Sequence, residues 1–475
     1  MGRRSLQALA IFVIAASGAC GASTPPPAAP PPPPPAPITP IVHPLAGQKV
    51  GVSGGGDLAG DAKASYDQGF RAWLAGDLQA AKASFGDAAR KAPSAASPHY
   101  SLGCVLERLG DTQGALDAYR AAFAANPKFE PAMGSYAVLL AQTGRGVDAE
   151  QFLSDKTGPG GATPALMTYR AEVKSIEGDS AGCQQIAQQA LAKQPDFKDA
   201  MIVIARDYYR NHRWDLARYA LQAILDGADD GSIPPRDKGN GEALLLRGLI
   251  GRETGQRKQA LADFEQAAHS RPDLFEAYIN LGEMKLEAGN ASEAQGPLEK
   301  AVRYAPNVAV AHLDLGDCYR LLGRAGDSKS ELDRAISMDS TLAGVHYDLG
   351  LLYLFSPSVP GASGQDDQIS KAIRELETYR SMRNAKTAKG QGDDVDELLS
   401  TAKRKQSELQ LKKQAAAAPA PAASAPPPPP PAAVHAAPAT ATTKGVPPAA
   451  KPAPAAKPAK PAAKPSGDIV RSLPN

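Results

Sequence analysis

Small residues recur at fixed positions along most of the chain, with larger apolar residues between them. The repeat length is 34 residues, and the first unit begins at Ala62. The eighth residue of successive units is Gly or Ala: Gly69, Gly103, Ala137, Ala171, Ala205, Gly248, Gly282, Gly316 and Gly350. The twentieth residue is also small: Ala81, Ala115, Ala149, Cys183, Ala217, Ala260, Ala294 and Ser328. Because small residues let helix backbones approach closely, this period predicts paired antiparallel helices stacked into a solenoid.

Glycines and prolines mark the helix boundaries within these units. A glycine lies where the two helices of a unit should be joined: Gly76, Gly110, Gly144, Gly178, Gly255, Gly289 and Gly323. Several units end on a proline, which does not continue a helix: Pro93, Pro127, Pro195, Pro272 and Pro306. We therefore expect an all-α protein with a solenoid of about nine helix pairs.

Interruptions of the pattern divide the chain further. Gly/Pro-rich stretches break the third unit at 157–161, follow the fifth unit at 229–240, and separate the two helices of the ninth unit at 356–367. The second helix of that unit is expected at about Gln368–Arg383, and a polar helix at Asp394–Lys413 is expected to cap the array. The predicted parts are a signal peptide (1–19), an anchor and linker (20–61), a first repeat block (62–230), a flexible or kinked junction (231–240), a second repeat block (241–384), a capping segment (385–413) and a tail (414–475).

The units resemble tetratricopeptide repeats, which carry small residues at positions 8, 20 and 27, an aromatic residue near 24 and proline at 32. The unit at 62–95 supplies Gly69, Ala81, Phe85, Ala88 and Pro93, and the unit at 96–129 supplies Gly103, Ala115, Tyr119, Ala122 and Pro127. The units at 241–274 and 275–308 match in the same way. The resemblance implies a superhelical solenoid, whose concave face is lined by the first helix of each pair.

The resemblance also implies which side chains meet a partner, through positions 2, 5, 9, 12 and 13 of the first helices. Carried onto this sequence, these positions give Tyr66, Phe70 and Trp73 in the first unit, Arg206, Tyr209 and Arg210 in the fifth, and Tyr347, Leu351 and Phe355 in the ninth. Two apolar ends and a basic, aromatic middle would suit an extended peptide or a partner helix. The alternative is that the terminal aromatic residues pack against a neighbouring helix and that the arginines pair with nearby acids.

Both ends of the chain differ in composition from the repeats. Residues 21–60 are rich in Pro and Gly, and residues 414–475 consist mostly of Ala, Pro, Lys, Ser and Thr. Too few large apolar residues are present to offset the entropy of ordering the chain, so we expect disordered or extended segments. From Lys412 onward, seven Lys and one Arg against Asp468 give a net charge of +7. The body is acidic by comparison, which argues against nucleic-acid binding, while the basic tail could contact peptidoglycan.

The first twenty residues predict export. Arg3 and Arg4 precede the apolar run Leu9–Ala16, which is too short to span a membrane. The run leads to Ser17–Cys20, a sequence that resembles the bacterial lipoprotein signal. The resemblance implies that Cys20 carries the lipid, and Gly21 in the next position implies an outer-membrane lipoprotein facing the periplasm. Ser17 replaces the usual Leu, so cleavage of a soluble exported protein near Cys20 is the alternative.

No combination of residues predicts catalysis or a cofactor. The sequence lacks a phosphate-binding loop and a nucleophile elbow, and we expect no enzyme activity. His99, His312 and His346 share position 4 of their units, but the distance between units is too long for a shared metal ion. Cys104, Cys183 and Cys318 are interpreted as packing residues.

The leading hypothesis is a non-enzymatic scaffold that binds proteins of a cell-envelope complex. The organisation resembles tetratricopeptide lipoproteins that support type IV pilus assembly, and those of the adventurous gliding-motility apparatus of myxobacteria. Two alternatives are an outer-membrane regulator of peptidoglycan synthesis and a periplasmic holdase chaperone. The holdase would need apolar concave surface across many units, whereas the middle units are polar.

Overall fold

The computed structural model describes residues 57–157, 162–227, 234–383 and 394–417. The described residues form nineteen α-helices and no strand. In the first half these are α1 (Gly60–Ala75), α2 (Leu78–Lys91), α3 (Ala96–Arg108), α4 (Thr112–Ala125), α5 (Glu130–Gln142), α6 (Gly146–Thr157), α7 (Pro164–Ile176), α8 (Ser180–Lys193), α9 (Lys198–Arg210) and α10 (Trp214–Leu225). The second half contains α11 (Gly241–Glu253), α12 (Arg257–Ser270), α13 (Phe275–Glu287), α14 (Ala291–Tyr304), α15 (Ala309–Leu321), α16 (Ala325–Met338), α17 (Ala343–Phe355), α18 (Gln365–Met382) and α19 (Val395–Ala417).

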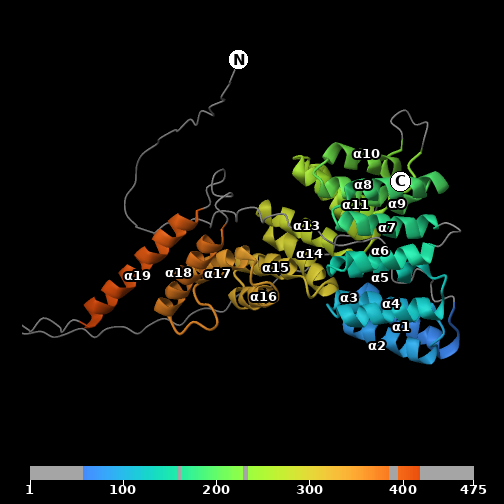
Figure 1. Ribbon diagram of the computed structural model, residues 1–475. Helices are drawn as coiled ribbons and strands as arrows, with labels where there is room; N and C mark the ends of the chain where they lie inside the picture. The colour runs from blue at the N-terminus through green and yellow to red at the C-terminus, as the bar shows by residue number, and fades with distance from the viewer. Residues whose placement is uncertain (1–56, 158–161, 228–233, 384–393, 418–475) are drawn as a thin grey trace, which may run out of the picture. The chain divides into compact units, whose positions relative to one another are not determined.

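The helices from α1 to α18 form nine consecutive pairs, each packed within itself and against the next (Figure 1). The odd-numbered helix is the first of each pair, and α19 follows the ninth pair. The prediction of an all-α solenoid with about nine helix pairs is confirmed.

The turn inside each pair uses the same local chemistry. The seven glycines at this turn have φ between 73° and 82°, the left-handed region that closes a helix without a Cβ clash. In three pairs an aspartate follows and caps the second helix, as where Asp77 accepts from the backbone N–H of Ala80 at 2.9 Å. The fifth pair has His212 at this turn, with φ 56°. Among the first eight pairs, it is the one position that the glycine pattern leaves unfilled.

The small residue at position 8 lies against the large residue at position 24 of the same unit. A Cβ added to Gly103 would lie 2.5 Å from the ring of Tyr119, a fully buried side chain. A Cβ on Gly248 would lie equally close to the ring of Phe264. Where position 8 is Ala205, position 24 is Leu221, and both are fully buried. Small residues are therefore required because a second helix packs directly over them.

The junction after the fifth pair is packed on both sides. One apolar cluster extends from Met201 in α9 to Ala311 in α15, so the core continues across the junction. In its described part, the backbone N–H of Asp237 donates to Ile224 O at 2.8 Å. The side chain of Asp237 also pairs with Lys198 at 3.0 Å. These contacts hold residues 234–240 against α9 and α10.

The helix α19 covers the end of the ninth pair. Val395, Leu398 and Leu399 are buried in a cluster shared with α17 and α18. The hydroxyl of Tyr347 donates to Asp394 at 2.8 Å. The ammonium of Lys405 lies 5.1 Å from the ring of Phe355. The capping contact thus involves two residues that were expected to meet a partner.

The signal peptide, Cys20, the linker up to residue 56 and the tail after residue 417 lie outside the described residues. Of the helices that are described, none combines the length and the apolar character needed to cross a bilayer.

Candidate functional site

Buried charge gathers on the first helices of the pairs. Thirteen Asp, Glu, Arg and His residues are buried in the described chain, and all but Asp263 and Asp273 lie on first helices. Those on first helices are Arg108, Glu172, Arg206, Asp207, Glu242, Glu276, His312, Asp314, Asp317, Arg320 and Asp348. Buried charges are costly unless they are paired or hydrogen-bonded, so their partners define what this row can do.

The middle of the row is an ion-pair network centred on Glu172 in α7. Its Oε2 accepts from Arg206 Nη1 at 2.7 Å, and its Oε1 accepts from Arg210 Nη2 at 2.8 Å. Arg206 also lies 3.7 Å from Glu242 of α11, so the network links three successive pairs. Burial alone would raise the pKa of Glu172, but the two guanidinium groups lower it below its ordinary value. The carboxylate is therefore ionised, and both of its oxygens accept hydrogen bonds.

The nine predicted partner residues differ widely in exposure. Phe355 is exposed, and Phe70 and Arg210 are half-buried. The other six are buried: Tyr66, Trp73, Arg206, Tyr209, Tyr347 and Leu351. Several of them make the contacts expected under the alternative, in which arginines pair with nearby acids and terminal aromatic residues pack against a neighbouring helix. Arg206 and Arg210 pair with Glu172, and the hydroxyl of Tyr347 is hydrogen-bonded to Asp394, just before α19. As partner contacts these residues remain predictions, and Phe70, Arg210 and Phe355 are the three that keep accessible surface.

A second buried guanidinium, Arg108 at the end of α3, lies between two aromatic rings. Its Cζ is 5.7 Å from the centre of the Trp73 ring and 4.6 Å from that of Phe275, at the start of α13. None of its three side-chain nitrogens has a hydrogen-bond partner, and neither do the two carboxylate oxygens of the buried Glu276. Burial raises the pKa of Glu276 to about 7, and the nearby Arg108 opposes this shift. This group joins α1 and α3 to a helix far along the chain.

A row of carboxylates occupies the first helices of the second half. Asp314 and Asp317 of α15 face Asp348 of α17, and Glu283 of α13 lies on the other side of Asp314. Burial and these neighbouring carboxylates raise the pKa of Asp314 well above its ordinary value. Arg320 donates through Nε to Asp317 at 2.9 Å. Acids therefore outnumber bases in this part of the row.

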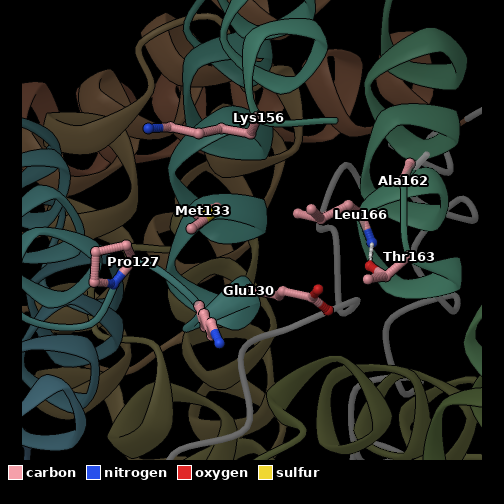
Figure 2. Close-up of a pocket in the computed structure, with 8 residues that line it drawn as sticks. Pro127, Glu130, Met133, Lys156, Ala162, Thr163 and Leu166 are labelled. Atoms are coloured by element: carbon pink, nitrogen blue, oxygen red, sulfur yellow. Dashed lines mark hydrogen bonds between the residues drawn. The ribbon is translucent and has the colours of Figure 1, made fainter. Parts of the chain in front are cut away.

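Figure 2 shows a separate pocket between the third and fourth pairs. Its volume is about 350 Å³, at the lower end of the range for ligand pockets. Its wall is partly apolar and carries the charged side chains of Lys128, Glu130 and Lys156. The other lining residues are Pro127, Met133, Ala162, Thr163 and Leu166. Lys156 also lies 5.6 Å from the ring of Phe152, which draws the ammonium toward that ring. The pocket has room for one side chain of a partner.

The histidines and cysteines make local contacts. His312 Nδ1 lies 2.6 Å from Glu331, and His346 Nδ1 lies 2.8 Å from Glu375. Cys104, Cys183 and Cys318 are free and buried, and burial raises the pKa of the Cys104 thiol to about 12. Within the described ranges, no group of three or more His, Cys, Asp and Glu side chains could hold a metal ion.

Sequence reasoning missed two features of this row: Arg108 with Glu276, and the carboxylates of α13, α15 and α17. The second had a signal, because Asp314 and Asp348 are both the sixth residue of their units. The first had none, since Arg108 and Glu276 are separated by 168 residues and only the tertiary fold brings them together.

Comparison with known proteins identifies the repeats. Residues 106–155 match one tetratricopeptide-repeat family model, and residues 66–128 and 285–343 match a second. No curated protein sequence matches the chain. The matched segments are tetratricopeptide repeats, and the described helices form a solenoid of the kind that such repeats build, a class of fold that serves as a scaffold for protein–protein interaction.

Solved structures with the same kind of fold share little sequence with it. The match to the APC/C hetero-tetramer Cut9-Hcn1 has 13% identity and a TM-score of 0.48, and spans 68% of this chain and 62% of that chain. A tetratricopeptide repeat protein from Parabacteroides merdae gives 13% identity and a TM-score of 0.31, over 65% and 98%. YrrB, a TPR protein with an unusual peptide-binding site, gives 16% identity and a TM-score of 0.24, over 41% and 95%.

Proposed function

We propose that the protein is a non-enzymatic scaffold lipoprotein that binds partner proteins of a cell-envelope machine. In this proposal a lipid on Cys20 anchors it to the outer membrane, facing the periplasm, and the machine serves gliding motility or type IV pilus assembly. The observation that carries the proposal is an array of nine helix pairs in a chain that begins with a lipoprotein-type sequence at Ser17–Cys20.

The accessible side chains support binding to proteins. Phe70 and Arg210 keep part of their surface on first helices, and Phe355 is 39% exposed at the end of α17. On α10, Tyr219 is 76% exposed. Tyr and Arg are enriched among the residues that dominate binding energy at protein interfaces. Isolated exposed apolar side chains also occur on ordinary surfaces, so the experiment must identify discrete partners.

The test is cross-linking followed by purification from native membranes, comparing the intact protein with the Cys20→Ala variant. The proposal expects a small set of envelope proteins that is recovered with the intact protein and lost with the variant. Metabolic labelling with a fatty-acid analogue checks the anchor itself, because label should enter the intact protein and be absent from Cys20→Ala. Recovery of the same partners from an unlabelled, soluble protein would refute the anchored scaffold.

Regulation of peptidoglycan synthesis is the second candidate, favoured by the net charge of +7 from Lys412 onward. It expects the full chain to sediment with purified peptidoglycan and a chain ending at residue 413 to remain in solution. It also expects deletion of the gene to sensitise cells to antibiotics that target the cell wall. A broad range of unrelated unfolded proteins in the purification would instead indicate a holdase.

A further inference from the structure

The first two helix pairs contact the seventh pair and the loop that follows it through residues that are far apart in sequence. The hydroxyl of Tyr304, the last residue of α14, donates to Leu74 O at 2.7 Å. The turn glycine Gly110 lies against the side chain of Asn307, such that an added Cβ would be 3.7 Å from Asn307 Cβ. The side-chain amide of Asn307 also donates to Arg108 O at 2.8 Å.

The centre of this contact is the Trp73–Arg108–Phe275 stack, with Glu276 beside it. We call these four residues, with the hydrogen bond from Tyr304 to Leu74, the clasp. The residues come from four helices: Trp73 from α1, Arg108 from α3, Phe275 and Glu276 from α13, and Tyr304 from α14. Trp73 is 2% exposed and Arg108 is 5% exposed, so the stack is closed to solvent.

The clasp combines weakly favourable contacts with unfavourable ones. A cation stacked on an aromatic ring and one neutral hydrogen bond each contribute modestly to stability. Against them, the guanidinium of Arg108 and the carboxyl group of Glu276 are buried without a hydrogen-bond partner, which is costly. In an open arrangement water would satisfy both groups, while the core of each helix pair would stay intact. Burial of the Trp73 and Phe275 rings favours the closed form and the unsatisfied buried charge favours the open form, so the equilibrium between them can respond to a partner.

We propose that the clasp opens and closes, and that its closed form covers part of the partner-binding surface of the first pair. The inference rests on the proposed function, because Trp73 and the neighbouring Phe70 belong to the residues expected to meet a partner. In the closed form Phe275 of α13 occupies the place on Arg108, next to Trp73, that a partner side chain would take. Opening exposes the side chains of Arg108 and Phe275, and Arg is a typical anchor of interfaces.

Disulfide trapping measures the closed form directly. In a Cys20→Ala background, Gly110→Cys and Asn307→Cys place two Cβ atoms at the 3.7 Å separation that suits a disulfide. The matched control pairs Asn307→Cys with Gly144→Cys, because Gly144 occupies the equivalent turn and has no atom within 4 Å of an added Cβ. The native Cys104, Cys183 and Cys318 are buried and should not compete. The cysteines at positions 110 and 307 should form a disulfide under mild oxidation, and those at positions 144 and 307 should not.

Phe275→Leu in the same cysteine background tests whether the stack holds the clasp. It keeps an apolar side chain at the start of α13 but removes the ring over Arg108, so it should slow cross-linking about tenfold, which corresponds to the loss of one cation–ring contact. Tyr304→Phe retains the ring and should slow it less. Circular dichroism establishes that each variant is folded. Absence of the disulfide in a folded protein, or an unchanged rate in both variants, would overturn the clasp.

Partner capture then separates the clasp from the proposed scaffold function. The cysteine pair is returned to the anchored protein, and the oxidised and reduced forms are compared by cross-linking purification. Fewer partners with the oxidised form support the regulation, and equal capture by both forms refutes it. If neither form captures discrete partners, the scaffold function fails, and with it the regulatory part of the inference. The cross-linking rates still decide whether the clasp itself exists.

Discussion

The Glu172 network allows a quantitative test of how the inner charges contribute to the fold. Replacement of Glu172 by Ala removes the carboxylate that pairs with Arg206 and Arg210, and leaves the buried Arg206 without its closest partner. Breaking a buried ion pair in this way costs about 3–5 kcal/mol, because one charge remains uncompensated in the interior. Arg206 retains Glu242 at 3.7 Å, so we expect a cost near the lower limit, about 3 kcal/mol.

The assay should report local stability, because each pair of a solenoid depends mainly on its neighbours. Hydrogen exchange of the amides in α7 and α9 is suited to this, since exchange from local opening follows the free energy of that opening. A loss of about 3 kcal/mol accelerates exchange more than a hundredfold. The matched control is Asp117→Ala, which breaks the pair with Arg120, where both side chains are more than half exposed. That change should cost less than about 1 kcal/mol.

Two results would refute this reasoning. If Glu172→Ala accelerates exchange no more than Asp117→Ala, the buried network contributes no more than a surface pair. If the acceleration spreads equally over all nine pairs, the stability is not local. A double replacement, Glu172→Met with Arg206→Met, separates the charge from the shape. Removal of both charges should recover much of the lost stability, because apolar side chains of similar size can replace a buried pair.

Three further predictions concern stability measured by urea unfolding. Gly103→Ala should destabilise the protein by about 1–3 kcal/mol, because the new Cβ meets the ring of Tyr119. The control is Gly86→Ala on the open face of α2, which should stabilise the protein by up to about 1 kcal/mol. His212→Gly should be stabilising by about 1 kcal/mol, because it relieves a left-handed backbone conformation in a residue with a Cβ; no gain would mean that the ring contact with Trp214 offsets the strain. The pKa of Glu276 is about 7 in the folded protein, and its ordinary value is 4.5. The contribution of Glu276 to the free energy of unfolding is therefore complete below pH 4.5 and is lost as the pH rises to about 7. Glu276→Gln should flatten the dependence of the free energy of unfolding on pH between about 4.5 and 7. An unchanged slope of stability against pH would refute the assignment to Glu276.

The sequence predicted most of the fold because its packing rule is local. A residue at position 8 meets the residue at position 24 of the same unit, so the pattern of Gly103 and Tyr119 is visible within one repeat. The turn glycines are visible for the same reason, and His212 escaped notice because it departs from them. The exposure of the candidate partner residues was not predictable in this way. Whether Arg206 faces solvent depends on Glu172, 34 residues earlier, and on Glu242 in the next pair.

Position within a repeat therefore identifies the helix face on which a residue lies, and the neighbouring repeats decide whether it is free to bind. The inner charges illustrate this difference along the solenoid. In the middle pairs, Arg206 and Arg210 share the carboxylate of Glu172 and Arg206 also lies near Glu242, so these charges stabilise the stacking of successive pairs. From α13 to α17, acids outnumber bases, and Asp314 keeps one oxygen without a hydrogen-bond partner. In the first two pairs, Arg108 has no carboxylate bonded to it, and its aromatic partners come from both α1 and α13. The last region can exchange its present contacts for a partner without breaking a hydrogen-bonded ion pair, which is why partner binding and the clasp should be tested at the same residues.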